Sequence, residues 1–135
     1  MTFEESANIL AILFANYHSS FKNFSEANAS AVAKTWSIAF ADVPAAIVYI
    51  AVMKWIDTER FPPKICEIKE IISRTLYYEA EEALTRHKKH RYLTEKAAAK
   101  YELIFDVACR MRSNRKELKL SNLIDAEGEY LLLLE

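Results

Sequence analysis

Two histidines, His87 and His90, are three residues apart in the run RHKKHR, a spacing that places both on one face of a helix. Imidazoles at that spacing can bind a metal ion, but the Lys and Arg side chains of the same run would repel a divalent cation. Neither a carboxylate nor a cysteine lies at ligand spacing beside the two histidines. The sequence therefore predicts no metal site and no cofactor.

The remaining reactive side chains form no recognisable catalytic arrangement. Carboxylates are numerous, but no Ser-His-Asp or Cys-His arrangement can be singled out by spacing. Cys66 and Cys109 lack the spacing of a disulfide framework, so we expect reduced, buried thiols. Glycine occurs once, at Gly128, which argues against the glycine-rich loop that holds nucleotide phosphates. We predict that the protein is not an enzyme.

Two clusters of basic residues are candidates for contacting nucleic acid. If both lie on one surface, they can neutralise several phosphates. The net charge of −1 gives no global attraction to polyanions, and solvated helix faces explain such runs equally well. The candidate residues are Arg86, Lys88, Lys89, Arg91, Arg110, Arg112, Arg115 and Lys116.

The sequence SNLIDAEGEYLLLLE contains four consecutive leucines, at positions 131 to 134. An exposed apolar run at a chain end promotes aggregation, so we expect these side chains to pack within the domain, across a homodimer or on a foreign partner. The candidate partner-binding residues are Leu123, Ile124, Tyr130, Leu131, Leu132, Leu133 and Leu134.

Capping signals and apolar spacing predict the helices that position these residues. A helix is expected at 3–17, where Thr2 and Glu5 have capping-box spacing, and a second follows a cap at Ser25 or Asn28. A third, over 44–56 with Asp42 as its cap, is apolar almost all round and is expected at the centre of the bundle. Further helices are predicted from Pro63 to a boundary near 88–93, over 94–111 with Thr94 as its cap, and from Asn114.

These elements predict an all-α fold, a compact bundle of five to six helices. With 135 residues and 52% hydrophobic content, the chain can bury one core. We expect a helical core at 1–76 and a helical extension at 77–135 that packs on it and ends in an apolar tail, as one domain overall. The N-terminal sequence lacks the basic residues of a secretory signal, and the apolar run 44–56 is shorter than the roughly 20 residues that span a bilayer. We therefore expect a cytoplasmic protein with no membrane contact.

Residues 36–72 carry a spaced combination of a Trp, the motif FPP and an Ile-x-x-Ile helix. This combination, together with the first helix NILAILFANY, resembles the phage helicase loader/inhibitor family over about residues 3–74. The signature residues are expected to be structural. They are Trp36, Phe61, Pro62, Pro63, Ile65 and Ile68.

The resemblance implies a folded helical N-terminal domain and a C-terminal segment that holds the hexameric replicative helicase until an origin-bound initiator takes over. We therefore interpret the chain as a phage or prophage DNA-replication accessory protein that binds and restrains or loads this helicase in the bacterial host cell. Two alternatives stay open. One is a DNA-binding phage protein that uses the basic clusters at 86–91 and 110–116, and the other is a homo-oligomeric structural module.

Overall fold

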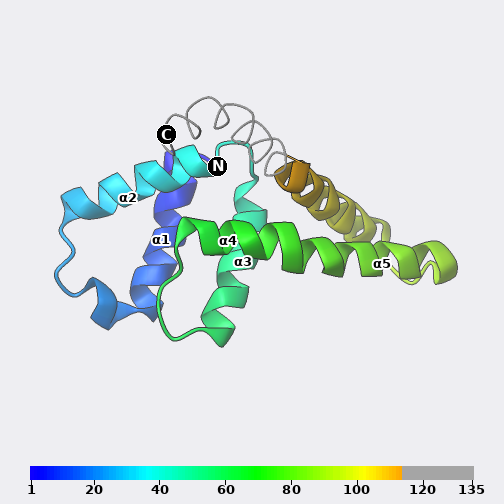
Figure 1. The fold of residues 1–135 in the computed structure, drawn as a ribbon, viewed down its shortest axis with the longest axis horizontal. Coiled ribbons are helices and arrows are strands. Elements are labelled where there is room, and N and C mark those ends of the chain that lie inside the picture. Colours follow the sequence, from blue (N-terminus) through cyan, green and yellow to red (C-terminus); the bar gives the residue numbers. More distant parts are fainter. Residues whose placement is uncertain (114–135) are drawn as a thin grey trace, which may run out of the picture. The chain divides into compact units, whose positions relative to one another are not determined.

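The computed structural model describes residues 1–113, which are folded into helices with no strand among them (Figure 1). The elements are α1 (Phe3–Asn16), the 3-10 turn η1 (His18–Phe21), α2 (Glu26–Ala39), α3 (Ala45–Thr58), α4 (Ile65–Glu70), the π-helical turn η2 (Ile71–Leu76), α5 (Tyr77–His90) and a helix at 95–113. The prediction of an all-α fold is confirmed. The chain divides into two compact units, Met1–Thr75 (unit 1) and Leu76–Glu135 (unit 2). The expected packing of residues 77–135 on the core stays a prediction.

The capping box predicted for the first helix is present. The Thr2 hydroxyl accepts the Glu5 backbone N–H at 3.2 Å, and the Glu5 carboxylate accepts the Thr2 backbone N–H at 2.9 Å. These bonds, first of all the one from the Thr2 backbone, lower the pKa of Glu5. Because the folded-state pKa is depressed, the stabilisation is present above the unfolded pKa and is lost as pH falls through the folded one.

The starts of α2 and α3 separate a correct capping prediction from a wrong one. Ser25, rather than Asn28, caps α2, because its hydroxyl accepts the Asn28 backbone N–H at 3.1 Å. Asp42 does not cap α3, whose N-cap is Pro44 with no side-chain hydrogen bond. The turn after α2 explains the error, since the Val43 N–H bonds back to the Phe40 carbonyl at 3.0 Å and α3 begins only at Ala45.

Unit 1 is built on contacts of α1 with α2 and α3, and of α3 with α4. A buried hydrogen bond from the Ser6 hydroxyl to the Ala33 carbonyl, 2.7 Å long, ties α1 to α2. The ring of Phe40, which is fully buried, lies 5.6 Å from that of Trp36. The largest other buried side chains of the unit are Leu13, Ile47, Val48, Val52, Ile68 and Ile72.

Helix α3 was expected to be enclosed on all sides, and this prediction is wrong. One face is buried through Ile47, Val48, Ala51 and Val52, but Tyr49 on another face is 44% exposed. The reason is that α1 and α4 are the described elements that pack extensively on α3, which leaves part of its apolar surface uncovered.

Unit 2 contains a helical hairpin formed by α5 and residues 95–113. The predicted boundary near 88–93 is confirmed, because α5 ends at His90 and the Thr94 hydroxyl accepts the Ala97 N–H at 3.2 Å. The Tyr77 ring stacks on Phe105 at 5.2 Å, so the second helix runs back antiparallel along α5. The predicted helix from Asn114 lies outside the described residues.

The two cysteines are free thiols, one in each unit. Cys66 is exposed and Cys109 is half-buried, so the prediction of buried thiols is wrong. Cys66 lies in the first turn of α4, where the buried side is taken by Ile68. No helix within residues 1–113 combines the length and the apolar character that crossing a membrane requires.

Candidate binding surfaces

The two predicted basic clusters are not brought together by the hairpin. Arg112 lies over the Tyr77 ring at 4.2 Å, beside the start of α5, whereas Arg86 to Arg91 lie at its other end. The 14 residues of α5 separate the two ends by about 20 Å, at about 1.5 Å per residue. Arg110 is paired with Asp106 at 3.4 Å. Arg115 and Lys116 lie outside the described residues.

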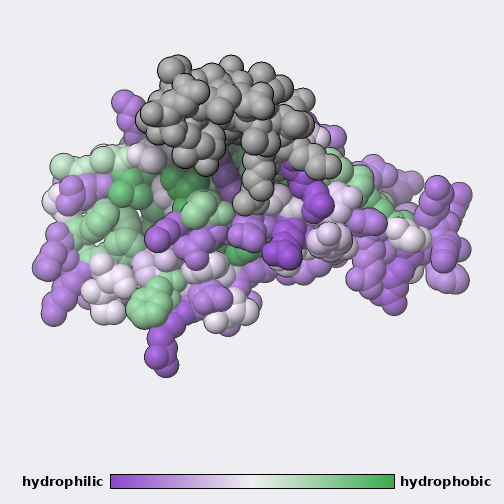
Figure 2. Space-filling model, in the orientation of Figure 1, coloured by the Kyte–Doolittle hydropathy of each residue, from purple (hydrophilic) through white to green (hydrophobic). Residues whose placement is uncertain are grey.

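Two lysines from the second helix join the first cluster instead. Because the chain turns back at 91–94, Lys96 and Lys100 lie at the same end of the hairpin as the last turn of α5. We call residues 86–100 the hairpin tip. It contains six Lys and Arg residues and one acid, Glu95, and the space-filling view shows this end of the hairpin as predominantly hydrophilic (Figure 2). Sequence reasoning missed the two lysines because they follow the turn.

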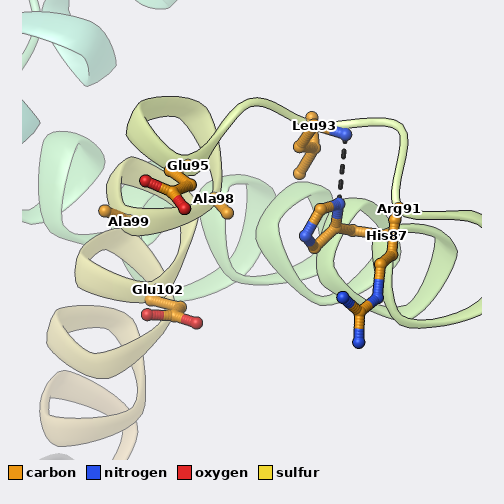
Figure 3. A pocket seen from close by; sticks show the side chains of 7 residues that line it. All are labelled: His87, Arg91, Leu93, Glu95, Ala98, Ala99 and Glu102. Carbon is orange, nitrogen blue, oxygen red and sulfur yellow. Dashed lines mark hydrogen bonds between the residues drawn. The ribbon is translucent and has the colours of Figure 1, made fainter.

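His87 has a structural partner at the tip. Its Nδ1 atom accepts the Leu93 backbone N–H at 3.0 Å, which helps to close the turn after α5 (Figure 3). That nitrogen is therefore occupied by a hydrogen bond in this structure. Across residues 1–113, no group of three or more His, Cys, Asp or Glu side chains is placed to hold a metal ion.

A pocket of about 350 Å³ opens between the end of α5 and the first turns of the second helix. Glu95 and Glu102 line one wall together with Ala98 and Ala99, while the other wall carries an imidazole and a guanidinium (Figure 3). Since carboxylates and a guanidinium face the same open space, the pocket presents no single charge to a small ligand.

In unit 1, the turn between α3 and α4 presents an exposed aromatic side chain. The Trp55 indole N–H donates to the Phe61 carbonyl at 2.7 Å, and the Tyr17 hydroxyl donates to the Glu59 carbonyl at 3.0 Å. Burial, with a smaller contribution from the charge of Glu59, raises the pKa of Tyr17. With its backbone held at two points, this turn leaves the Phe61 side chain 70% exposed. We call residues 59–63 the Phe61 turn.

Comparison with protein families adds the deciding observation. Residues 1–69, just over half of the chain, match the model for the N-terminal domain of the phage helicase loader/inhibitor family. The chain belongs to this family. The match covers α1 to α3 and nearly all of α4, all within unit 1. The comparisons with curated proteins and with solved structures gave no match.

The signature residues of this loader/inhibitor-family chain serve two different purposes. Trp36, Pro63 and Ile68 are buried in unit 1, and Pro62 and Ile65 are half-buried. Phe61 differs from them because its ring points to solvent. An FPP motif is typical of a helix stop, so no signal in the sequence indicated that its aromatic residue is displayed at the surface.

The partner-binding residues predicted from the leucine-rich sequence, Leu123, Ile124 and Tyr130 to Leu134, lie outside the described residues. Their role in this loader/inhibitor-family protein is taken up as part of the proposed function.

Proposed function

We propose that this protein is a phage or prophage DNA-replication accessory factor that binds the hexameric replicative helicase of the host, restrains it and delivers it to origin DNA. The observation that carries the proposal is the match of residues 1–69 to the N-terminal domain of the loader/inhibitor family. The surfaces of unit 1 agree with a binding role, since an exposed aromatic side chain on a fixed turn is a typical protein-contact feature.

In this proposal the protein acts in the bacterial cytoplasm and hands the helicase to an origin-bound initiator. The segment with Leu123, Ile124 and Tyr130 to Leu134 supplies apolar anchors for a groove on the helicase. Chemistry that depends on nucleotide belongs to the helicase, and this protein contributes binding energy alone.

The direct test uses the full chain and purified replicative helicase, with and without ATP. We expect the two proteins to co-migrate in size-exclusion chromatography when ATP is present, and the complex to unwind a forked DNA substrate more slowly than free helicase. Separate migration under both conditions would rule out the proposed partner.

A substitution at the Phe61 turn tests whether unit 1 contributes to the contact. Replacing Phe61 with Ala is expected to weaken helicase binding by about tenfold or more, because a buried aromatic anchor contributes about 2 kcal/mol or more at an interface. The fold should be unaffected, since the Trp55 indole bonds to the backbone of residue 61 and not to its side chain. Isothermal titration calorimetry measures the affinity.

The matched control for this substitution is Ile38→Ala, which removes a 67%-exposed apolar side chain from α2. We expect Ile38→Ala to bind the helicase as the unaltered protein does. Equal affinities for the two variants would show that Phe61 is no anchor.

A further inference from the structure

The hairpin tip concentrates positive charge that is not neutralised within the described part of the chain. Its six cations, Arg86, Lys88, Lys89, Arg91, Lys96 and Lys100, are all exposed, and none forms an ion pair with another residue among 1–113. Residues 86–100 therefore carry a formal charge of six positive minus one negative, or +5, while the whole chain carries −1. A local field of this kind attracts a polyanion even though the protein as a whole does not.

Helix stability explains only part of this charge. Lys88 and Lys89 lie in the last turn of α5, where cations interact favourably with the helix dipole. Lys96 lies in the first turn of the helix at 95–113, where the same dipole disfavours a cation. Lys100 follows Lys96 by four residues, so the two like charges face each other on one helix surface and destabilise it.

Arg91 adds a cost in backbone conformation. It adopts the left-handed conformation, with φ 44° and ψ 48°, directly after α5, and no other non-glycine residue within 1–113 has a positive φ. Glycine is favoured at this position of a helix end because a side chain is strained there. The tip thus places a cation where the fold alone favours glycine, and strain of this kind points to a role in function.

An aromatic ring lies among these cations. Tyr92 is 52% exposed, and its hydroxyl donates to the Ala83 carbonyl at 3.3 Å, which fixes the ring against α5. The Arg86 guanidinium lies 5.8 Å from the ring centroid. Proteins that bind single strands combine these two features, with cations that follow the phosphates and aromatic rings on which bases stack.

We propose that the hairpin tip binds single-stranded nucleic acid, with phosphates contacted by its six cations and a base stacked on Tyr92. This surface goes beyond the proposed helicase contact and does not depend on it, since the tip lies in unit 2 and the family match ends at residue 69. A single strand fits better than a duplex because the ring of Tyr92 is accessible to an unpaired base.

The test measures fluorescence anisotropy of a labelled oligothymidylate of about 20 nucleotides, titrated with the full chain at several salt concentrations. If six phosphates are neutralised, the affinity is expected to fall about 300-fold between about 50 and 200 mM salt. The decisive variant combines Arg91→Gly and Lys96→Glu. Both changes favour the fold, by removing backbone strain and by placing an acid at a helix N-terminus, so an unchanged or higher Tm is expected together with about tenfold weaker binding.

The matched control combines Lys22→Gly and Lys34→Glu, which changes the net charge by the same −3 on exposed residues of unit 1. We expect it to bind the oligonucleotide as the unaltered chain does. The proposal is overturned if no binding occurs at low salt, if the two double variants lose affinity equally, or if a duplex binds as tightly as the single strand. Equal affinity for polyglutamate would also overturn it, in favour of an acidic protein segment as the partner.

Discussion

Replacing Phe40 with Ala is expected to destabilise unit 1 by about 3–5 kcal/mol, most of the stability of a small domain. The side chain is fully buried at the end of α2, its ring is 5.6 Å from that of Trp36, and the Lys69 ammonium lies over it at 5.8 Å. The substitution therefore removes contacts to two other elements and leaves a cavity. Urea unfolding followed by tryptophan fluorescence measures the loss, because both tryptophans, Trp36 and Trp55, lie in unit 1.

The control for this substitution is Ile38→Ala, which alters a neighbouring position of the same helix. Since Ile38 is 67% exposed, its truncation is expected to change the free energy of unfolding by less than about 0.5 kcal/mol. Coincident unfolding midpoints for the two variants would contradict the placement of Phe40 in the core.

The features predicted correctly from the sequence depend on residues close together in the chain. The capping box of Thr2 with Glu5 and the cap at Thr94 each join residues three apart, and both are present. The buried positions Ile68, Ile72 and Leu76 likewise follow from helical spacing. The spacing did not reveal the π-helical turn at Ile71–Leu76, because apolar residues four apart fit an α-helix equally well.

The features that were missed depend on contacts between distant residues. The exposure of Phe61 follows from hydrogen bonds that Trp55 and Tyr17 make to the turn backbone, the second across 42 residues. The composition of the hairpin tip depends on where the chain reverses, which decides that Lys96 and not Arg110 accompanies Arg91. Candidate surfaces therefore needed the folded chain, whereas the fold class and the family could be predicted without it.

Deleting residues 121–135 is expected to abolish helicase retention. The deletion removes seven candidate apolar anchors, and each contributes about 1.5–3 kcal/mol if fully buried at an interface. Their loss exceeds the roughly 8 kcal/mol that holds a micromolar complex together. Pull-down of purified helicase by the truncated chain, in the presence of ATP, measures the effect. The tryptophan unfolding transition is expected to stay unchanged, since it reports unit 1.

The control for the deletion keeps every leucine and neutralises the acids of the segment by Asp125→Asn, Glu127→Gln and Glu129→Gln. If apolar burial drives the contact, this variant retains the helicase and the truncated chain does not. Retention by the truncated chain would exclude the segment as the anchor and leave the Phe61 turn as the contact. Because Phe40→Ala unfolds unit 1 with residues 121–135 intact, its capture of helicase shows whether that segment binds independently of the folded unit or only beside it.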